Sequence, residues 1–120
     1  MKNIAPEIFR QRLIIEGYYN IDVTEEVVRK YLTGLAENLS LRIYGDPIIF
    51  SPATGMGKEE NAGFDAFVPL IDSGISAYIW SSVKFFSIVI YTCKGFDEKS
   101  AVEFTREYFA VTGELVNSSF

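Results

Sequence analysis

Three short segments rich in β-branched and aromatic residues follow one another at about 63–71, 75–81 and 84–93, and this succession most constrains the fold. They are punctuated only by Asp72-Ser73-Gly74 and by Ser81-Ser82. Such short connections leave no room for a crossover helix, so neighbouring strands must run antiparallel. The second half of the chain is therefore predicted to form an antiparallel meander.

Two amphipathic segments with helix-start signals flank these strands. Thr24 is expected to cap the first helix, with Glu25 and Glu26 favourably placed at the positive end of its dipole, and Asp97 is expected to cap the second. Each segment carries a single stripe at helical spacing, which predicts one buried face per helix. The stripes are Val27, Val28, Tyr31, Leu32, Leu35 and Leu39 in the first, and Ala101, Phe104, Thr105, Tyr108 and Phe109 in the second.

The remaining segments complete the predicted sheet. Residues 12–19 are expected to form the first strand, and residues 41–50 a strand that is bent or lies at an edge, because Pro47 has no N–H to donate. Residues 51–62 are expected to form a polar connecting loop. Residues 113–120 are expected to be a tail, in which a short strand could form near Leu115 and Val116.

The element order β-α-β-β-β-β-α predicts an α+β fold over a single domain, residues 1–120. We expect a two-layer sandwich, mainly an antiparallel sheet with both helices on one face. The strands are apolar on both faces, so the sheet face without helices would be left uncovered. We therefore expect the chain to form a homodimer through this open sheet face.

The absence of histidine excludes several classes of enzyme. Histidine is the commonest metal ligand and the side chain best suited to proton transfer at neutral pH, so zinc hydrolases, Ser-His-Asp enzymes and a metal site are not expected. The net charge of −5 with scattered basic residues argues against nucleic acid as a partner. No apolar run approaches the roughly 20 residues of a membrane span, no signal peptide is expected, and the single Cys93 suits a reducing cytoplasm.

The tract from Phe64 to Trp80, followed by Thr92-Cys93, resembles the small prokaryotic S-adenosylmethionine decarboxylases, which depend on a pyruvoyl group. Asp72-Ser73 matches the family's acidic residue and serine in a turn, and Trp80 matches its tryptophan. Thr92-Cys93 arrives at the family spacing without a gap. Upstream, residues 12–18 resemble the family's first strand with its glutamate, so the resemblance covers about residues 11–110.

The resemblance implies a proenzyme that cleaves itself between Asp72 and Ser73. The Ser73 hydroxyl would attack the preceding carbonyl to give an ester that eliminates, and Ser73 would become the pyruvoyl cofactor. That group would act as the electron sink for decarboxylation, and Cys93 would deliver a proton to the product carbon. The implied role is to decarboxylate S-adenosylmethionine for polyamine (spermidine) synthesis.

Four residues are implied as walls of the substrate site: Glu16, Phe64, Phe67 and Trp80. A sulfonium cation favours acidic and π-rich surroundings, which these side chains would supply. The expected ligand is therefore a small molecule, S-adenosylmethionine or a related amine.

The chain departs from the family pattern at three positions. Tyr78 stands where the family has the histidine that assists processing, Asp65 where it has a second serine, and Gly74 where a histidine usually follows the cleavage serine. A phenol is a poorer base than imidazole at neutral pH, although it can donate a hydrogen bond. Asp65 could supply the missing base.

Functions other than a self-cleaving S-adenosylmethionine decarboxylase remain open. The chain could be a homologue that does not process itself and acts as a ligand-binding or regulatory partner, or a decarboxylase of another amino acid. It could also be a plain structural dimer, because a serine between Asp and Gly is a common turn residue and a lone cysteine is usually a small buried hydrophobe. Gly55-Met56-Gly57-Lys58 is expected to be a flexible connector and not a phosphate-binding loop.

Overall fold

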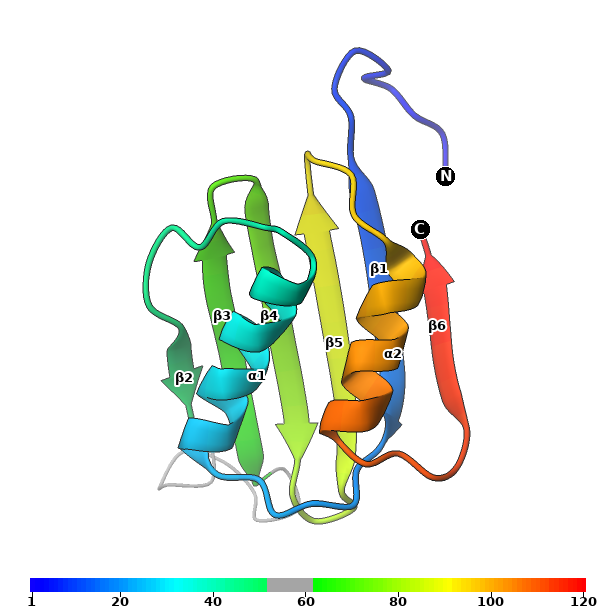
Figure 1. Cartoon of the computed structure of the whole chain (residues 1–120). Helices are drawn as coiled ribbons and strands as arrows, with labels where there is room; N and C mark the ends of the chain where they lie inside the picture. Colours follow the sequence, from blue (N-terminus) through cyan, green and yellow to red (C-terminus); the bar gives the residue numbers. More distant parts are fainter. Residues whose placement is uncertain (52–61) are drawn as a thin grey trace.

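The computed structural model describes residues 1–51 and 62–120, which form a six-stranded antiparallel sheet covered on one face by two helices (Figure 1). The predicted Gly55–Lys58 connector lies outside the described residues. The strand order is β2-β3-β4-β5-β1-β6. The two-layer α+β prediction is confirmed. In chain order the elements are β1 (Gln11–Tyr18), α1 (Glu25–Asn38), β2 (Ile48–Phe50), β3 (Gly63–Leu70), β4 (Ser73–Trp80), β5 (Phe85–Thr92), α2 (Glu98–Tyr108) and β6 (Leu115–Ser119).

The predicted strand at residues 41–50 is much shorter than expected. Only β2, at its end, pairs with β3, and Ile43 contributes a single isolated bridge to Leu70. Between them lies Gly45-Asp46-Pro47, where the proline cannot donate to a ladder. β2 is therefore an edge strand, and the residues before Gly45 meet the end of β3 through the isolated bridge at Ile43.

The tail forms a full strand that the predicted element order omitted. In β6, Leu115 pairs with Gly17 and Ser119 pairs with Leu13, so this strand completes the outer edge of β1. Without β6, the outer N–H and C=O groups of β1 would have no strand partner. The polar sequence of the tail gives little sign of this pairing, because β6 is an edge strand and is mostly exposed.

Both predicted helix starts are confirmed by their capping geometry. Oγ1 of Thr24 accepts a hydrogen bond from the amide of Val27 at 3.2 Å. A carboxylate oxygen of Asp97 accepts from the amides of Lys99 and Ser100 at 3.0 and 3.3 Å. These bonds satisfy N–H groups that have no partner within the helix, and they fix where each helix begins.

The hydrophobic core lies between the helices and the sheet. The ring of Phe86 in β5 stacks on Phe109 at the end of α2, with ring centroids 4.5 Å apart. Tyr31 of α1 packs against Phe109 at 4.7 Å and is fully buried. Its hydroxyl lies 2.7 Å from Oγ1 of Thr105, which itself bonds to the carbonyl of Ala101 at 2.8 Å. The core thus holds both helices on the same face of the sheet.

Replacing Tyr31 with Phe should cost about 1 kcal/mol near neutral pH, since one buried hydrogen bond is lost while Thr105 keeps its bond to Ala101. Burial raises the pKa of Tyr31, an effect that the bond with Thr105 partly offsets. The tyrosine stays un-ionised in the folded chain after its unfolded counterpart has lost its proton. Its contribution to stability is therefore complete below about pH 10 and is lost as the pH rises above it.

Urea unfolding of the native protein and the Tyr31→Phe variant at pH 8 and pH 11 checks this. The native protein should lose more stability over that interval than the variant. Part of the loss should persist in the variant, because burial also raises the pKa values of Tyr19 and Tyr108. Equal losses in the two proteins would contradict the assignment.

Candidate functional site

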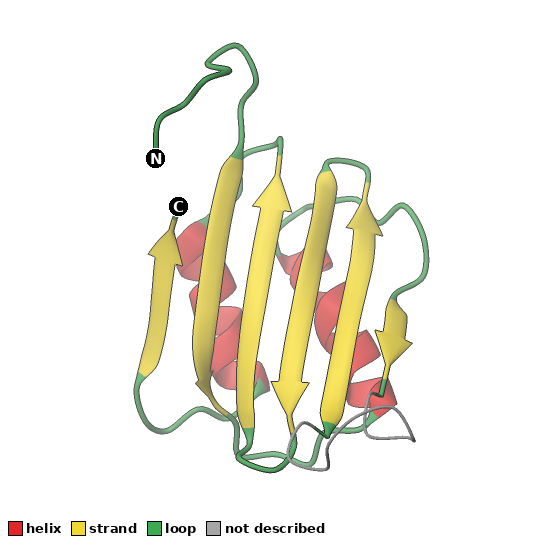
Figure 2. Ribbon diagram, turned by 180° about the vertical axis from the view of Figure 1, so that it is seen from behind, coloured by secondary structure: helices red, strands yellow, loops and turns green. Residues whose placement is uncertain are grey.

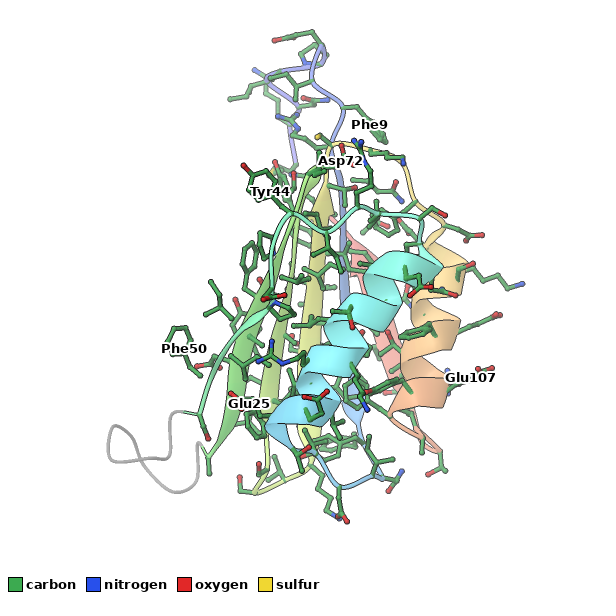
Figure 3. All side chains as sticks on the ribbon, turned by 60° about the vertical axis from the view of Figure 1, so that its left-hand side comes forward. Phe9, Glu25, Tyr44, Phe50, Asp72 and Glu107 are labelled. Atoms are coloured by element: carbon green, nitrogen blue, oxygen red, sulfur yellow. The ribbon has the colours of Figure 1, made fainter. Side chains whose placement is uncertain are left out.

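The sheet face turned away from the helices is open to solvent and largely apolar (Figure 2). Because side chains alternate along a strand, every second residue points to this face. Phe50, for example, projects away from the sheet on the side opposite α1 (Figure 3) and is 65% exposed. We call this surface the open face; its central residues are Arg12, Ile14, Glu16 and Tyr18 of β1, Ile48 and Phe50 of β2, Asp65 and Phe67 of β3, Gly74, Ser76, Tyr78 and Trp80 of β4, and Phe85, Ser87, Val89 and Tyr91 of β5.

The Asp72–Ser73 peptide lies at one end of the sheet, in the tight turn from β3 to β4. Leu70 pairs with Ser73 across this turn, and Ser73 pairs in turn with Thr92 of β5. The amide of Cys93 donates a hydrogen bond to the carbonyl oxygen of Asp72 at 2.9 Å. The fold thus places Asp72, Ser73 and Cys93 next to one another, and Figure 3 shows Asp72 at this end of the molecule.

The backbone at this turn is strained. Ser73 has a φ of 129°, a conformation that an L residue adopts at a cost of about 1–3 kcal/mol. Beside it, Oδ2 of Asp72 is buried and has no hydrogen-bond partner among the described residues. Nη2 of Arg42 lies 3.9 Å from this oxygen and forms an ion pair that is loose for a charge-assisted bond. Strain and an unsatisfied carboxylate oxygen therefore occur on the two sides of one peptide bond.

Two hollows lie on the open face, and the first of them adjoins the turn. The first, which we call the Ser73 cavity, has a volume of about 380 Å³, and the second, the Tyr78 cavity, about 250 Å³. Phe67 and Ser76 line both of them. The Ser73 cavity is also lined by Ser73, Gly74, Val89 and Tyr91, and the Tyr78 cavity by Ile48, Phe50, Asp65, Ala66 and Tyr78.

A row of polar side chains crosses the open face farther from the turn. Asp65, Tyr78, Ser87 and Glu16 occupy matching positions in four adjacent strands. Oγ of Ser87 donates to Oε2 of Glu16 at 2.7 Å. Tyr78 lies five residues along β4 from Ser73, a distance of about 16 Å at the rise of a strand. Within one chain, the row is therefore not next to the peptide bond whose cleavage it was expected to assist.

The expected wall residues occupy different places. Phe67 borders the Ser73 cavity, whereas Trp80 lies at the far end of β4, with its ring 5.4 Å from that of Phe85. Phe64 is on the helix-facing side of β3 and packs against the core. Cys93 is exposed just after the end of β5. It is therefore not the small buried hydrophobe that a lone cysteine usually is.

Sequence reasoning missed Val89 and Tyr91, which line the Ser73 cavity from β5. The register of the β4–β5 hairpin could have identified these two residues. Tyr91 pairs with Gly74 and Val89 pairs with Ser76, so both side chains share the face of the cavity. Counting alternate residues back from Cys93 would have found them.

Two negative findings apply to residues 1–51 and 62–120. These residues contain no group of three or more histidine, cysteine, aspartate or glutamate side chains that could hold a metal ion. Over the same ranges, neither helix is long and apolar enough to cross a membrane.

Comparison with known proteins gives a match in structure only. No family model matches the sequence, and no curated protein matches it. The fold is similar to the crystal structure of the adenosylmethionine decarboxylase from Aquifex aeolicus, with a TM-score of 0.72. The match covers 94% of this chain and 89% of that chain, at 16% sequence identity. The relationship expected from the sequence is thereby confirmed at the level of the fold.

Proposed function

We propose that the chain is an S-adenosylmethionine decarboxylase-like enzyme of polyamine synthesis that cleaves itself between Asp72 and Ser73. The observation that carries this proposal is the hydrogen bond from the amide of Cys93 to the carbonyl oxygen of Asp72, 2.9 Å long, beside the strained Ser73. The similarity of the fold to an adenosylmethionine decarboxylase supports the same reading.

The Cys93 amide fits the first step of cleavage. When Oγ of Ser73 attacks the Asp72 carbonyl carbon, negative charge develops on the carbonyl oxygen, to which the Cys93 amide already donates. A donor held in place before the reaction stabilises that charge without reorganisation. The attack transfers the acyl group from nitrogen to oxygen. The resulting ester removes the amide that holds Ser73 at its strained φ, so strain release favours the step.

Completion of cleavage converts Ser73 into the new N-terminus of the second fragment. Elimination from Ser73 releases the Asp72 carboxylate, and addition of water with loss of ammonia leaves the pyruvoyl group. The site fits such a group, because Ser73 lies at the wall of the Ser73 cavity, where a ligand can approach it. Once formed, a pyruvoyl group supplies the electron sink for decarboxylation. Cys93 is exposed next to Ser73 and is suited to donate the proton.

A second copy of the chain would complete this site. The open face measures about 24 Å across its six strands and about 26 Å along an eight-residue strand. In projection this is about 600 Å², comparable to the roughly 800 Å² that each partner buries in a standard interface. Face-to-face packing about a two-fold axis running across the strands would bring opposite strand ends together. The partner subunit's Tyr78 and the partner subunit's Asp65 would then approach this chain's Ser73.

Denaturing mass spectrometry of the purified protein tests the proposal. Self-cleavage predicts two fragments, residues 1–72 and 73–120, the second blocked by a pyruvoyl group. A thermal-shift series with S-adenosylmethionine, arginine and ornithine then tests the ligand, and S-adenosylmethionine should give the largest shift. An intact chain under all conditions would contradict self-cleavage.

A homologue that does not cleave itself is the second candidate, and the polar row favours it. Tyr78 and Asp65 stand in the positions of the family's processing residues, and neither is an imidazole. In this reading the chain binds S-adenosylmethionine or a related amine, or pairs with an active partner and regulates it. A shift with S-adenosylmethionine from a chain that stays intact would support this candidate.

Replacing Tyr78 with His tests whether the missing histidine limits the rate of self-cleavage. Imidazole exchanges protons near neutral pH, so Tyr78→His should raise the cleavage rate at least about tenfold if this residue assists processing. The matched control is Tyr18→His, on the same face in β1 but at the far end of the sheet from Ser73. Timed mass spectrometry gives both rates. An equal rise in the control variant would show that the position of the imidazole does not matter.

A further inference from the structure

Phe67 is shared by the two cavities of the open face. Phe67 lines the Ser73 cavity on one side and the Tyr78 cavity on the other. Ser76, which pairs with Phe67 across β3 and β4, lines both cavities as well. The two cavities therefore adjoin at Phe67 and Ser76.

Gly74 is what allows the ring to occupy this position. A Cβ atom added at Gly74 would lie 2.5 Å from Cζ of Phe67, well inside van der Waals contact. The backbone of Gly74 is not in the left-handed region, so its lack of a side chain is needed for space and not for conformation. The ring thus lies directly over the residue that follows Ser73.

The Phe67 side chain is partly exposed in the single chain. Phe67 is 40% exposed, and the Ser73 cavity lies beside it. A partly exposed ring can change its rotamer at modest cost when a ligand presses on it.

We infer that Phe67 is a specificity-determining residue that limits how far a ligand held at Ser73 extends toward Tyr78. This inference rests on the proposed function, in which the ligand's amine lies at Ser73. A compact amino acid such as ornithine fits within the Ser73 cavity and leaves the ring in place. A longer ligand such as S-adenosylmethionine displaces the ring to enter the Tyr78 cavity, where Asp65 offers a negative charge to a cation.

Replacing Phe67 with Ala joins the cavities and tests this inference. Dissociation constants for S-adenosylmethionine and ornithine are measured by thermal-shift titration of the purified protein and the variant. Phe67→Ala should change the ratio of the two constants at least about tenfold in favour of S-adenosylmethionine. A ratio that shifts toward ornithine would show that the ring stacks on the long ligand, and would overturn the inference.

Val89→Ala is the matched control, because Val89 lines only the Ser73 cavity. It enlarges that cavity without removing the ring of Phe67, so the ratio should change less than about twofold. An equal change of the ratio in the two variants would mean that the total cavity volume decides selectivity, and would contradict the proposed role of Phe67.

A pair of stability measurements tests the steric premise without a ligand. Gly74→Ala should lower the melting temperature by about 4 °C or more in the native background, because the ring must leave its place. In the Phe67→Ala background the same change should have little effect. Equal effects in both backgrounds would contradict the premise.

The results also separate this inference from the proposed function. If Phe67→Ala binds both ligands with an unchanged ratio of dissociation constants, only the specificity-determining role of Phe67 is contradicted. If neither ligand binds the native protein or the Phe67→Ala variant, the proposed function is contradicted, and the specificity-determining role of Phe67 with it.

Discussion

Replacing Ser73 with Ala is expected to abolish cleavage and to leave the full chain of 120 residues as a single species. Ala has no hydroxyl to attack the Asp72 carbonyl, and no other step in the scheme breaks that peptide bond. The expected loss is complete, because hydrolysis of an ordinary peptide bond is far slower than a purification. Denaturing mass spectrometry after extended incubation reads the result directly.

Ser76→Ala is the matched control for this experiment. Ser76 also lies on β4 and lines the same cavity. Because its hydroxyl is not next to the Asp72–Ser73 peptide bond, its replacement should leave cleavage intact. Cys93→Ser should likewise still give both fragments while lowering turnover, since the amide that bonds to Asp72 belongs to the backbone. Fragments from Ser73→Ala would show that another group breaks the chain.

Ser73→Gly tests the strain separately from the chemistry. Gly reaches a φ of 129° without the penalty that a Cβ imposes. Neither variant can cleave, so Ser73→Gly and Ser73→Ala can be compared as intact chains. The glycine variant should be more stable by about 1 kcal/mol. Equal stability would mean that strain contributes nothing to cleavage.

Local signals predicted most of the fold. Thr24 and Asp97 cap the helices as expected, because a capping side chain and the first turn it serves are neighbours in sequence. The tight turns between β3, β4 and β5 forced an antiparallel meander. The edge strand β6 was not in the predicted order, because its pairing depends on the free edge of β1, far away in the chain.

The candidate site was predictable in part for the same reason. The hairpin register places Cys93 beside Asp72, so their spacing in sequence carried real information. The φ of Ser73 and the ring of Phe67 over Gly74 could not be read from sequence, because both depend on packing in three dimensions. The distance from Ser73 to Tyr78 follows from the rise of a strand, and it directs attention to a second subunit.

Replacing Ile14 with Asp is expected to convert the proposed dimer into monomers. Ile14 of β1 pairs with Val89 near the centre of the open face, and its side chain points away from the helices. Burying a carboxylate at the centre of an apolar interface leaves an unpaired charge, which costs several kcal/mol and should raise the dissociation constant at least about 1,000-fold. Sedimentation equilibrium over a range of concentrations measures it.

Asn38→Asp is the matched control, since it adds the same charge at the exposed end of α1, on the helix side. It should leave the association unchanged, and both variants should keep the circular dichroism of the native fold. A native chain that is monomeric at all concentrations would contradict the proposed interface at once.

The Ile14→Asp variant also decides whether one chain suffices for cleavage. Tyr78 and Asp65 are about 16 Å along the sheet from Ser73 of the same chain, too far for a direct hydrogen bond. If these residues assist cleavage across the interface, the monomeric variant should cleave far more slowly than the native protein. Monomers that cleave at the native rate would show that the turn reacts alone. Strain at Ser73 and the Cys93 amide would then be the whole of the processing machinery, and Tyr78 and Asp65 would have no part in it.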